Sequence, residues 1–173
     1  MIILVGASAT GKTEVGKVLS EKFNIKKVVT YTTRPMRIHE VDGIDYNFIT
    51  EEEFKRLTEN NFFFETMNYN SFNYGTSYES LKENAYVILD PTGLKKYINS
   101  EVEAKSFYLF CDPLVRAKRM TSRGDSTSNV RQRLEVDAKV FTEELKTLVD
   151  HVIEVDELSI EEVAEMVFTL SNQ

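Results

Sequence analysis

The chain begins with Met1-Ile2-Ile3-Leu4-Val5 and runs directly into Gly6-Ala7-Ser8-Ala9-Thr10-Gly11-Lys12-Thr13. The first five residues form an apolar run, which predicts a buried strand. The next eight match the pattern G-x-x-x-x-G-K-[ST], and Val15, Val18 and Leu19 follow at helical spacing. A glycine-containing turn between a strand and a helix is the setting that a phosphate-binding loop requires. This stretch therefore predicts an α/β fold that binds a nucleoside triphosphate.

The residue types of this loop explain why it would bind phosphate. Glycines let the backbone curl with its N–H groups pointing inward, and the start of a helix adds partial positive charge. The Lys12 ammonium can then reach the β- and γ-phosphates, and the Thr13 hydroxyl can bind Mg²⁺. We expect the triphosphate to be bound by Gly6, Ala7, Ser8, Ala9, Thr10, Gly11, Lys12 and Thr13.

Length and composition narrow the class of protein. A chain of 173 residues suits one compact domain with small inserts. The sequence has no secretory signal and no run near the ~20 apolar residues of a membrane span. Its single cysteine, Cys111, excludes an internal disulfide and is typical of a reducing cytosol, so we expect a cytoplasmic protein. The net charge of −7 argues against a general nucleic-acid-binding surface.

The charge is distributed unevenly along the chain. Between residues 116 and 133 there are six basic residues and one acid, whereas residues 134–173 contain eleven acids and two lysines. In a chain with a triphosphate loop, we expect the basic stretch to contact a small polyanion. The alternative is a solvated helix face, and we assign Arg116 and Lys118 to it.

The hydrophobic pattern predicts alternating strands and helices. Apolar runs at 85–89, 106–111 and 152–155 predict further buried strands, with a shorter one at 27–30. We expect helices at 77–84 and from Val130 to Leu148, among others. This order predicts a three-layer α/β P-loop NTPase fold with a parallel core sheet, a small mixed α+β insert and a lid. The expected boundaries are 1–30, 80–117 and 135–173 for the core, 31–79 for the insert and 118–134 for the lid.

A second group of motifs occupies residues 30–48. It reads Thr30-Tyr31-Thr32-Thr33-Arg34-Pro35-Met36-Arg37 and then Glu40-Val41-Asp42-Gly43-Ile44-Asp45-Tyr46-Asn47-Phe48. This region resembles the guanylate kinases, whose motifs here are S-x-T-T-R-x-x-R and G-E-x-x-G-x-D-Y-x-F. The resemblance continues, in the family's order, at Glu65, Tyr74-Gly75-Thr76, Ile88-Leu89-Asp90, Arg119 to Arg123-Gly124, Arg133 and His151-Val152-Ile153. It implies Mg²⁺-dependent transfer of the ATP γ-phosphate to GMP or dGMP.

The resemblance assigns the phosphate of the acceptor nucleotide to Arg34, Arg37, Tyr46 and Tyr74. Two arginines three positions apart can present planar forks to one phosphate, and tyrosine hydroxyls can donate to the same group. The alternative for the arginines is surface ion pairing with Glu40 or Asp42. For the tyrosines it is ordinary half-buried packing.

The resemblance assigns the guanine base to Glu65, Thr30 and Thr76. A carboxylate can accept hydrogen bonds from both N1–H and the exocyclic amine of guanine, a pair that adenine lacks. An unpaired buried acid is costly, so this pocket would discriminate against adenine. The two threonines occupy positions that are usually serine and supply hydroxyl groups. The alternative for Glu65 is a surface acid at the end of a strand.

In the basic stretch, Arg119 and Arg123 resemble lid arginines that close over the triphosphate, and Arg133 resembles one that reaches in from the next helix. Arg119 is thereby assigned to ATP binding. Positioning and charge neutralisation account for most of the catalysis of phosphoryl transfer. The residues expected to be catalytic are Lys12, Arg34, Arg123 and Arg133. Asp90 is a candidate for the outer Mg²⁺ shell, and the alternative is a helix cap before Pro91.

Three of the departures from the family pattern lie in the phosphate loop and two residues after Asp90. Ala7 and Ala9 stand where family loops have proline and glycine, and alanine at position 9 is tolerable if its φ is negative. Thr92 stands where a second acid is usual. Two alternative functions therefore stay open: a kinase of this fold with another nucleotide or a phosphorylated sugar as acceptor, and a non-catalytic phosphopeptide-binding module. The retained Lys12 and Thr13 argue against the second. The sequence leaves the oligomeric state open.

Overall fold

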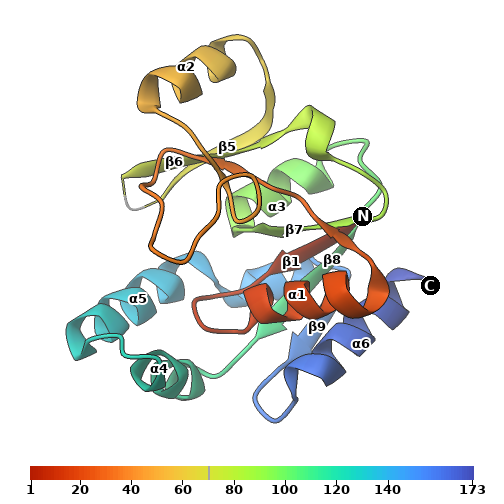
Figure 1. Ribbon diagram of the computed structural model, residues 1–173. Helices are drawn as coiled ribbons and strands as arrows, with labels where there is room; N and C mark the ends of the chain where they lie inside the picture. Colours follow the sequence, from red (N-terminus) through yellow and green to blue (C-terminus); the bar gives the residue numbers. More distant parts are fainter. Residues whose placement is uncertain (70) are drawn as a thin grey trace.

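The computed structural model describes residues 1–69 and 71–173. Five parallel strands form the core sheet in the order β2-β7-β1-β8-β9 (Figure 1). Their bounds are β1 (Ile2–Val5), β2 (Lys26–Lys27), β7 (Ala85–Leu89), β8 (Lys105–Phe110) and β9 (His151–Glu154). The expected parallel sheet is confirmed, with β1 at its centre. The loop that leaves β1 is therefore supported on both sides by neighbouring strands.

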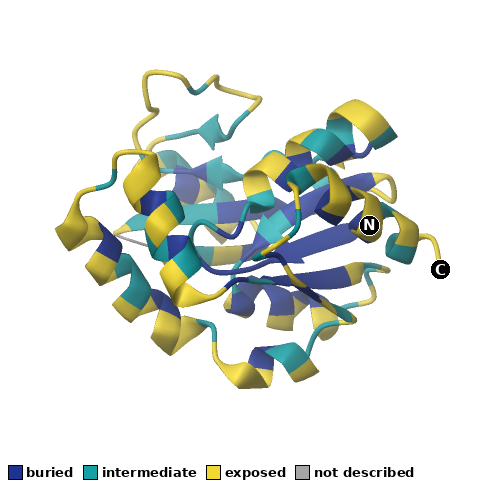
Figure 2. Cartoon of the chain, turned by 90° about the horizontal axis from the view of Figure 1, so that it is seen from below, coloured by how far each residue is buried: buried dark blue, intermediate teal, exposed yellow. Residues whose placement is uncertain are grey.

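Helices cover both faces of the core sheet, because side chains alternate along each buried strand. Leu4 of β1 packs with residues of α1 (Lys12–Phe23) and α6 (Ile160–Ser171) in one apolar cluster. Ile3 packs with α3 (Pro91–Ile98) and with Leu145 of the 3₁₀ helix η2 (Glu143–Thr147) in the other. Figure 2 shows the buried strands enclosed between these layers. In the described ranges, no helix combines the length and the apolarity needed to cross a membrane.

Local signals set the starts of several helices. Asp112 accepts the backbone N–H of Leu114 at 2.7 Å and precedes Pro113, the first residue of α4 (Pro113–Ser122). Ser159 and Glu162 form a complete capping box at the start of α6. These caps satisfy backbone donors that a helix leaves unpaired at its first turn. They also fix where the chain turns after β8 and β9.

A second, mixed sheet lies beside the core and is built entirely from residues between 31 and 77 (Figure 1). Its order is β4-β3-β6-β5, with β3 (Tyr31–Thr32), β4 (Asn47–Phe48), β5 (Phe63–Tyr69) and β6 (Phe72–Ser77). The helix α2 (Glu51–Glu59) covers it through Phe54, whose ring stacks on Phe63 at 4.7 Å between centroids. Thr50 caps α2 by accepting the N–H of Glu53 at 3.1 Å.

Three predicted elements differ from the structure. The strand expected at 27–30 is limited to Lys26–Lys27, and the helix expected at 77–84 is reduced to the 3₁₀ turn η1 (Tyr78–Ser80). There the Ser80 hydroxyl donates to the Ser77 carbonyl at 2.7 Å, a local bond that competes with helix formation. The long helix ends early: α5 is Thr127–Val140, and Phe141 leaves helical geometry at φ −101°, ψ 74°. The rings of Phe141 and Tyr108 stack at 6.4 Å, so core packing turns the chain at this point.

Candidate active site

The predicted phosphate loop joins β1 to α1, and two of its glycines are required by geometry. A Cβ on Gly6 would lie 2.8 Å from both the Leu109 carbonyl oxygen and the Thr10 hydroxyl. Gly11 has φ +96°, a backbone conformation that residues with a Cβ atom rarely adopt. The loop thus lies tightly against the end of β8.

Ala9 corrects one expectation about the loop. Alanine here was expected to be tolerable with a negative φ, but the structure has φ +63°. This left-handed conformation places Cβ close to the following carbonyl oxygen. The loop therefore keeps the backbone conformation that suits a glycine at this position. Ala9 adopts that conformation at a cost in conformational free energy.

Lys12 lies over the loop that precedes it. Its Nζ donates to the carbonyl oxygens of Gly6 at 2.6 Å and Ala7 at 2.8 Å. Burial lowers the pKa of Lys12 to about 8, while the nearby Asp137 charge opposes this fall and Arg116 adds to it. The ammonium is thus held at the mouth of the loop, where a phosphate would meet it.

Two oxygen-bearing side chains follow the central strands, one in α1 and one directly after β7. Thr13 is exposed in the first turn of α1. Asp90 follows β7 and caps α3, because its Oδ1 accepts the N–H of Gly93 at 2.8 Å. The capping alternative for Asp90 is thus what the structure contains, and Oδ2 is not engaged in that bond. Within the described ranges, no cluster of three or more His, Cys, Asp or Glu residues could hold a metal ion.

Arg34, Tyr46 and Tyr74 come together at the insert sheet. The Arg34 guanidinium carbon lies 5.3 Å from the centroid of the Tyr46 ring, and the rings of Tyr46 and Tyr74 lie 6.0 Å apart. Arg34 Nη2 also pairs with Glu40 Oε1 at 2.7 Å, so the ion pair of the alternative is present, but it is not a surface pair, because the two side chains are 11% and 17% exposed. That bond raises the pKa of Arg34 and lowers the pKa of Glu40. Arg37 is exposed, and its backbone N–H donates to Glu40 Oε2 at 2.8 Å.

Glu65 is buried at 4% exposure, so the surface-acid alternative is wrong. It pairs across β5 and β6 with Thr76, whose hydroxyl donates to Glu65 Oε1 at 2.6 Å. The other carboxylate oxygen, Oε2, is among the buried side-chain atoms of the described residues that have no hydrogen-bond partner. Burial raises the pKa of Glu65. Thr30 is half-buried just before β3, where its carbonyl accepts the N–H of Asn47 at 2.9 Å.

Tyr97 is a residue of this region that sequence reasoning missed. It lies on α3 at 3% exposure, and its hydroxyl is another buried atom without a partner in the described residues. Burial first, and the Glu65 charge second, raise the pKa of Tyr97. The available signal was its spacing, since Tyr97 follows the fully buried Leu94 by three positions and shares its helix face.

The predicted lid arginines occupy different environments. Arg119 is tied to the phosphate loop and to the end of the core sheet, because it donates to the Ala9 carbonyl at 3.4 Å and the Val155 carbonyl at 2.9 Å. Arg123 pairs with Asp125 at 2.6 Å and is 48% exposed. Arg133 is half-buried on α5. Of these three, Arg119 is the one that hydrogen-bonds to the loop among the described residues.

Arg116 was expected to be a solvated helix residue, and that expectation is wrong. It is 5% exposed and forms a buried ion pair with Asp137, which the sequence analysis did not single out. The signal for Asp137 was its position in the apolar stripe of α5, seven residues after the buried Val130. An acid at a core-facing position requires a buried partner. Lys118, by contrast, is exposed as expected.

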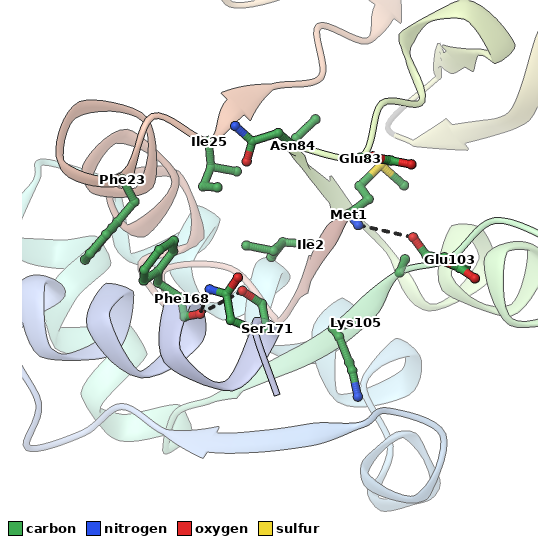
Figure 3. A pocket seen from close by; sticks show the side chains of 13 residues that line it. Met1, Ile2, Phe23, Ile25, Glu83, Asn84, Glu103, Lys105, Phe168 and Ser171 are labelled. Carbon is green, nitrogen blue, oxygen red and sulfur yellow. Dashed lines mark hydrogen bonds between the residues drawn. The ribbon is translucent and has the colours of Figure 1, made fainter.

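A separate hollow lies at the opposite, amino-terminal edge of the core sheet (Figure 3). Phe23 and Phe168 stack there at 4.2 Å between ring centroids. The amino group of Met1 donates to the Glu103 carbonyl at 3.1 Å in the same place. None of the lining residues belongs to the predicted nucleotide sites, so this hollow is not part of the candidate active site.

Comparisons with known proteins find relatives that span most of this chain. A family model described as Guanylate kinase matches residues 1–170. The guanylate kinase of Syntrophus aciditrophicus is 34% identical over 143 residues, which cover 78% of this chain and 69% of that protein. The Schizosaccharomyces pombe guanylate kinase is 32% identical over 145 residues, 78% of this chain and 71% of that protein. The crystal structure of guanylate kinase from Anaplasma phagocytophilum matches with a TM-score of 0.73 at 23% identity, covering 98% of this chain and 83% of that one.

Proposed function

The chain belongs to the guanylate kinase family and transfers the γ-phosphate of ATP to GMP, and on that premise we propose which residues perform each part of the reaction. In this transfer an oxygen of the GMP phosphate attacks the γ-phosphorus while the bond to the ADP oxygen breaks. The protein must hold the two nucleotides in line, neutralise the moving charge and exclude water.

The phosphate loop and Lys12 bind the donor. The loop amides surround the β-phosphate, and the Lys12 ammonium moves from the loop carbonyls to the β- and γ-phosphate oxygens. Support comes from its place at the mouth of the loop, with Nζ 2.6 Å from the Gly6 carbonyl oxygen. An anion at this position would favour the charged form of Lys12, and thus raise its pKa again.

Arg34, Arg37, Tyr46 and Tyr74 bind the phosphate of GMP. Arg34 is held by Glu40 and by the faces of the Tyr46 and Phe48 rings, so its guanidinium is oriented in advance. Arg37 is exposed and is free to turn toward an incoming phosphate. Two arginine forks and two phenols can together neutralise the acceptor while its oxygen attacks.

The observation that carries the acceptor assignment is the buried carboxylate of Glu65. Thr76 satisfies Oε1, and Oε2 has no partner in the described structure although burying such an oxygen is costly. A guanine edge presents two adjacent N–H donors to a carboxylate, whereas adenine presents an acceptor at N1. GMP binding would therefore satisfy an oxygen that the fold leaves unpaired, and AMP binding would not.

The lid arginines stabilise charge on the transferring phosphoryl group. Arg119 contributes to ATP binding, while Arg123 and Arg133 act as catalytic residues when the lid (residues 118–134) and the insert (31–79) close on the core. Closure would exclude water, which would otherwise accept the γ-phosphate. The exposed ion pair of Arg123 with Asp125 is weak enough to exchange for a phosphate contact.

We also propose Mg²⁺ as the divalent metal of the reaction. The exposed hydroxyl of Thr13 and the second oxygen of Asp90 are the hard oxygen donors that Mg²⁺ prefers, and a site with few protein ligands suits an ion bound mainly by phosphates. When bound, Mg²⁺ neutralises charge on the β- and γ-phosphates. The single, buried Cys111 supports a cytoplasmic location, and the net charge of −7 supports small nucleotides rather than nucleic acid as partners.

The assigned contacts reach the base and the phosphate but not the 2′-hydroxyl, so dGMP is proposed as a second acceptor. The test is ADP release from ATP and Mg²⁺ with GMP, dGMP, AMP, CMP, UMP and dTMP. Turnover with GMP and dGMP alone is expected. Lys12→Ala should abolish turnover and leave GMP binding within a few-fold, and Glu65→Gln should lose discrimination between GMP and AMP. Unchanged discrimination would remove Glu65 from the base pocket.

A further inference from the structure

A buried ion pair joins α4, α5 and the phosphate loop, and none of the roles above uses it. Arg116 Nη1 lies 2.7 Å from Asp137 Oδ2, and each side chain is 6% exposed. Asp137 Oδ2 also accepts the backbone N–H of Ser8 at 3.0 Å, and Oδ1 accepts the Ser8 hydroxyl at 3.3 Å. Arg116 Nη1 lies 3.4 Å from the Ser8 carbonyl oxygen. Both partners thus contact one residue of the loop.

Stability is a weak explanation for this pair. The desolvation of two buried charges often cancels their attraction, and an apolar pair of similar volume is frequently as stable. Here the Nε–H of Arg116 is also buried and has no acceptor in the described ranges. A pair that leaves a donor unsatisfied is better explained by what it holds in place than by the energy it adds.

The pair lies at the base of the lid. Arg116 comes just before residue 118 and Asp137 just after residue 134, so the two ends of the lid meet at Ser8. Asp137 follows Arg133 by four positions on α5, which places the two side chains on the same helix face. Arg116 likewise precedes Arg119 by three positions on α4. The contacts of Arg116 and Asp137 with Ser8 therefore set where α4 and α5 lie along their axes, and how they are rotated about them, relative to the loop.

The pair also balances charge beside Lys12. A carboxylate bonded to a loop amide would repel an incoming triphosphate if it stood alone. Arg116, at 2.7 Å, neutralises it. The opposite effects of Asp137 and Arg116 on the pKa of Lys12 agree with this geometry.

We propose that Arg116 and Asp137 are positioning residues of the kinase reaction: they fix the base of the lid to Ser8, so that Arg133 reaches the transferring phosphoryl group from a set position. Arg116 additionally makes the Asp137 carboxylate compatible with bound ATP. The proposal rests on the proposed roles of Lys12 and Arg133.

The first test is a double-mutant cycle of Asp137→Ala and Arg133→Ala, with kcat and the KM for ATP and GMP measured for each variant. Asp137→Ala should lower kcat by about 10–100-fold, the scale of a misplaced catalytic group, with little change in the KM for GMP. In the Arg133→Ala background it should lower kcat little further, because it acts through Arg133. Additive losses, or a wild-type kcat for Asp137→Ala with an impaired Arg133→Ala, would refute the positioning role. A wild-type kcat for Arg133→Ala would instead refute the proposed function of Arg133.

The second test separates charge from position by calorimetric titration with ATP. Arg116→Leu leaves Asp137 uncompensated and should weaken ATP binding about tenfold or more, the effect of one unpaired charge. The double variant Arg116→Leu/Asp137→Ala should recover ATP affinity while its kcat stays low. Equal ATP affinity in the wild type and Arg116→Leu would overturn the charge argument.

Two controls keep these tests interpretable. Glu135→Ala removes the exposed pair with Arg131 on the same helix and should leave kcat and ATP binding unchanged. Asp137→Asn has the shape of the native side chain and keeps an acceptor for the Ser8 N–H, so it serves if Asp137→Ala fails to fold. Its kcat should be lower than that of the wild type, and a wild-type kcat together with unchanged ATP affinity would refute the proposal.

Discussion

Replacing Glu65 with glutamine is expected to stabilise the free enzyme and to destabilise its complex with GMP. The carboxylate is 4% exposed, one of its oxygens has no partner in the described structure, and burial raises its pKa. A buried acceptor left unpaired costs about 1–3 kcal/mol, and more when it is charged. A neutral amide of the same shape removes the charged part of this cost. We expect Glu65→Gln to raise the free energy of unfolding at pH 7 by about 1 kcal/mol.

The gain should depend on pH with a defined sign. Between the ordinary glutamate pKa and its raised value in the fold, the native state keeps a proton that the unfolded state has lost. The free energy of unfolding of the wild type therefore falls as pH rises through this window. Glutamine does not titrate, so the advantage of Glu65→Gln should be small near pH 4 and grow toward pH 7.

With GMP bound, the wild type should be more stable than Glu65→Gln. Each hydrogen bond to a charged group contributes about 1.5–3 kcal/mol, so losing one weakens GMP binding about 10–100-fold. At a GMP concentration 100 times the wild-type Kd, the ligand adds about 2.7 kcal/mol to the wild type. It adds only about 0.4 kcal/mol to a variant that binds 100-fold more weakly.

Thermal unfolding with and without GMP measures both effects. Without GMP the variant should melt about 2–4 °C above the wild type at pH 7, and with GMP it should melt below it. Glu79→Gln, at an exposed acid nearby, should change neither value. A lower melting temperature without ligand, or equal shifts by GMP, would refute the reasoning.

Three further predictions concern the phosphate loop and the acceptor site. Because the pKa of Lys12 is about 8, kcat/KM for ATP should fall above about pH 8 in the wild type and stay flatter in Lys12→Arg; a flat wild-type profile to about pH 9.5 would contradict this. Ala9→Gly should raise the free energy of unfolding by about 1 kcal/mol in urea titrations, since φ there is +63°. Ala7→Gly, at a buried position, should lower the free energy of unfolding. A lower free energy of unfolding in both glycine variants would exclude strain at Ala9. Arg37→Ala should raise the KM for GMP at least about tenfold with an unchanged melting temperature, because the side chain is exposed; an unchanged KM would make Arg37 a surface residue.

Features set by short stretches of chain could be predicted from the sequence. The buried strands follow from apolar runs, and the loop between β1 and α1 follows from eight consecutive residues. The starts of α4 and α6 follow from Asp112 with Pro113 and from Ser159 with Glu162. In each case the interacting groups lie within a few positions of one another, so a short sequence pattern is enough to predict the interaction.

Features set by contacts between distant segments could not be predicted. The end of α5 depends on how Phe141 packs against Tyr108, thirty-three positions earlier in the chain. Arg116 looked like part of a basic, solvated face because its partner, Asp137, is far away in sequence. The sign of φ at Ala9 could not be predicted for a similar reason, because the conformation of the loop depends on its packing against β8. Charge composition describes a neighbourhood in sequence, whereas burial depends on the neighbourhood in space.

Among the described residues, the buried polar atoms without a hydrogen-bond partner mark places where the fold is less stable than it could be. Glu65 Oε2 and Tyr97 Oη lie on the side of the proposed base pocket, and Arg116 Nε lies beside the phosphate loop. A buried polar group without a partner costs free energy in any fold, so such groups are retained where another role requires them. Two of these residues, Tyr97 and Arg116, were not among the predicted site residues. Glu65→Gln and Tyr97→Phe, which neutralise or remove an unpaired atom without breaking an ion pair, should therefore stabilise the free protein and impair base selection together. Arg116 differs, because its removal leaves the buried Asp137 carboxylate without a partner. This opposite change in stability and activity is the property that distinguishes a functional buried group from a packing defect.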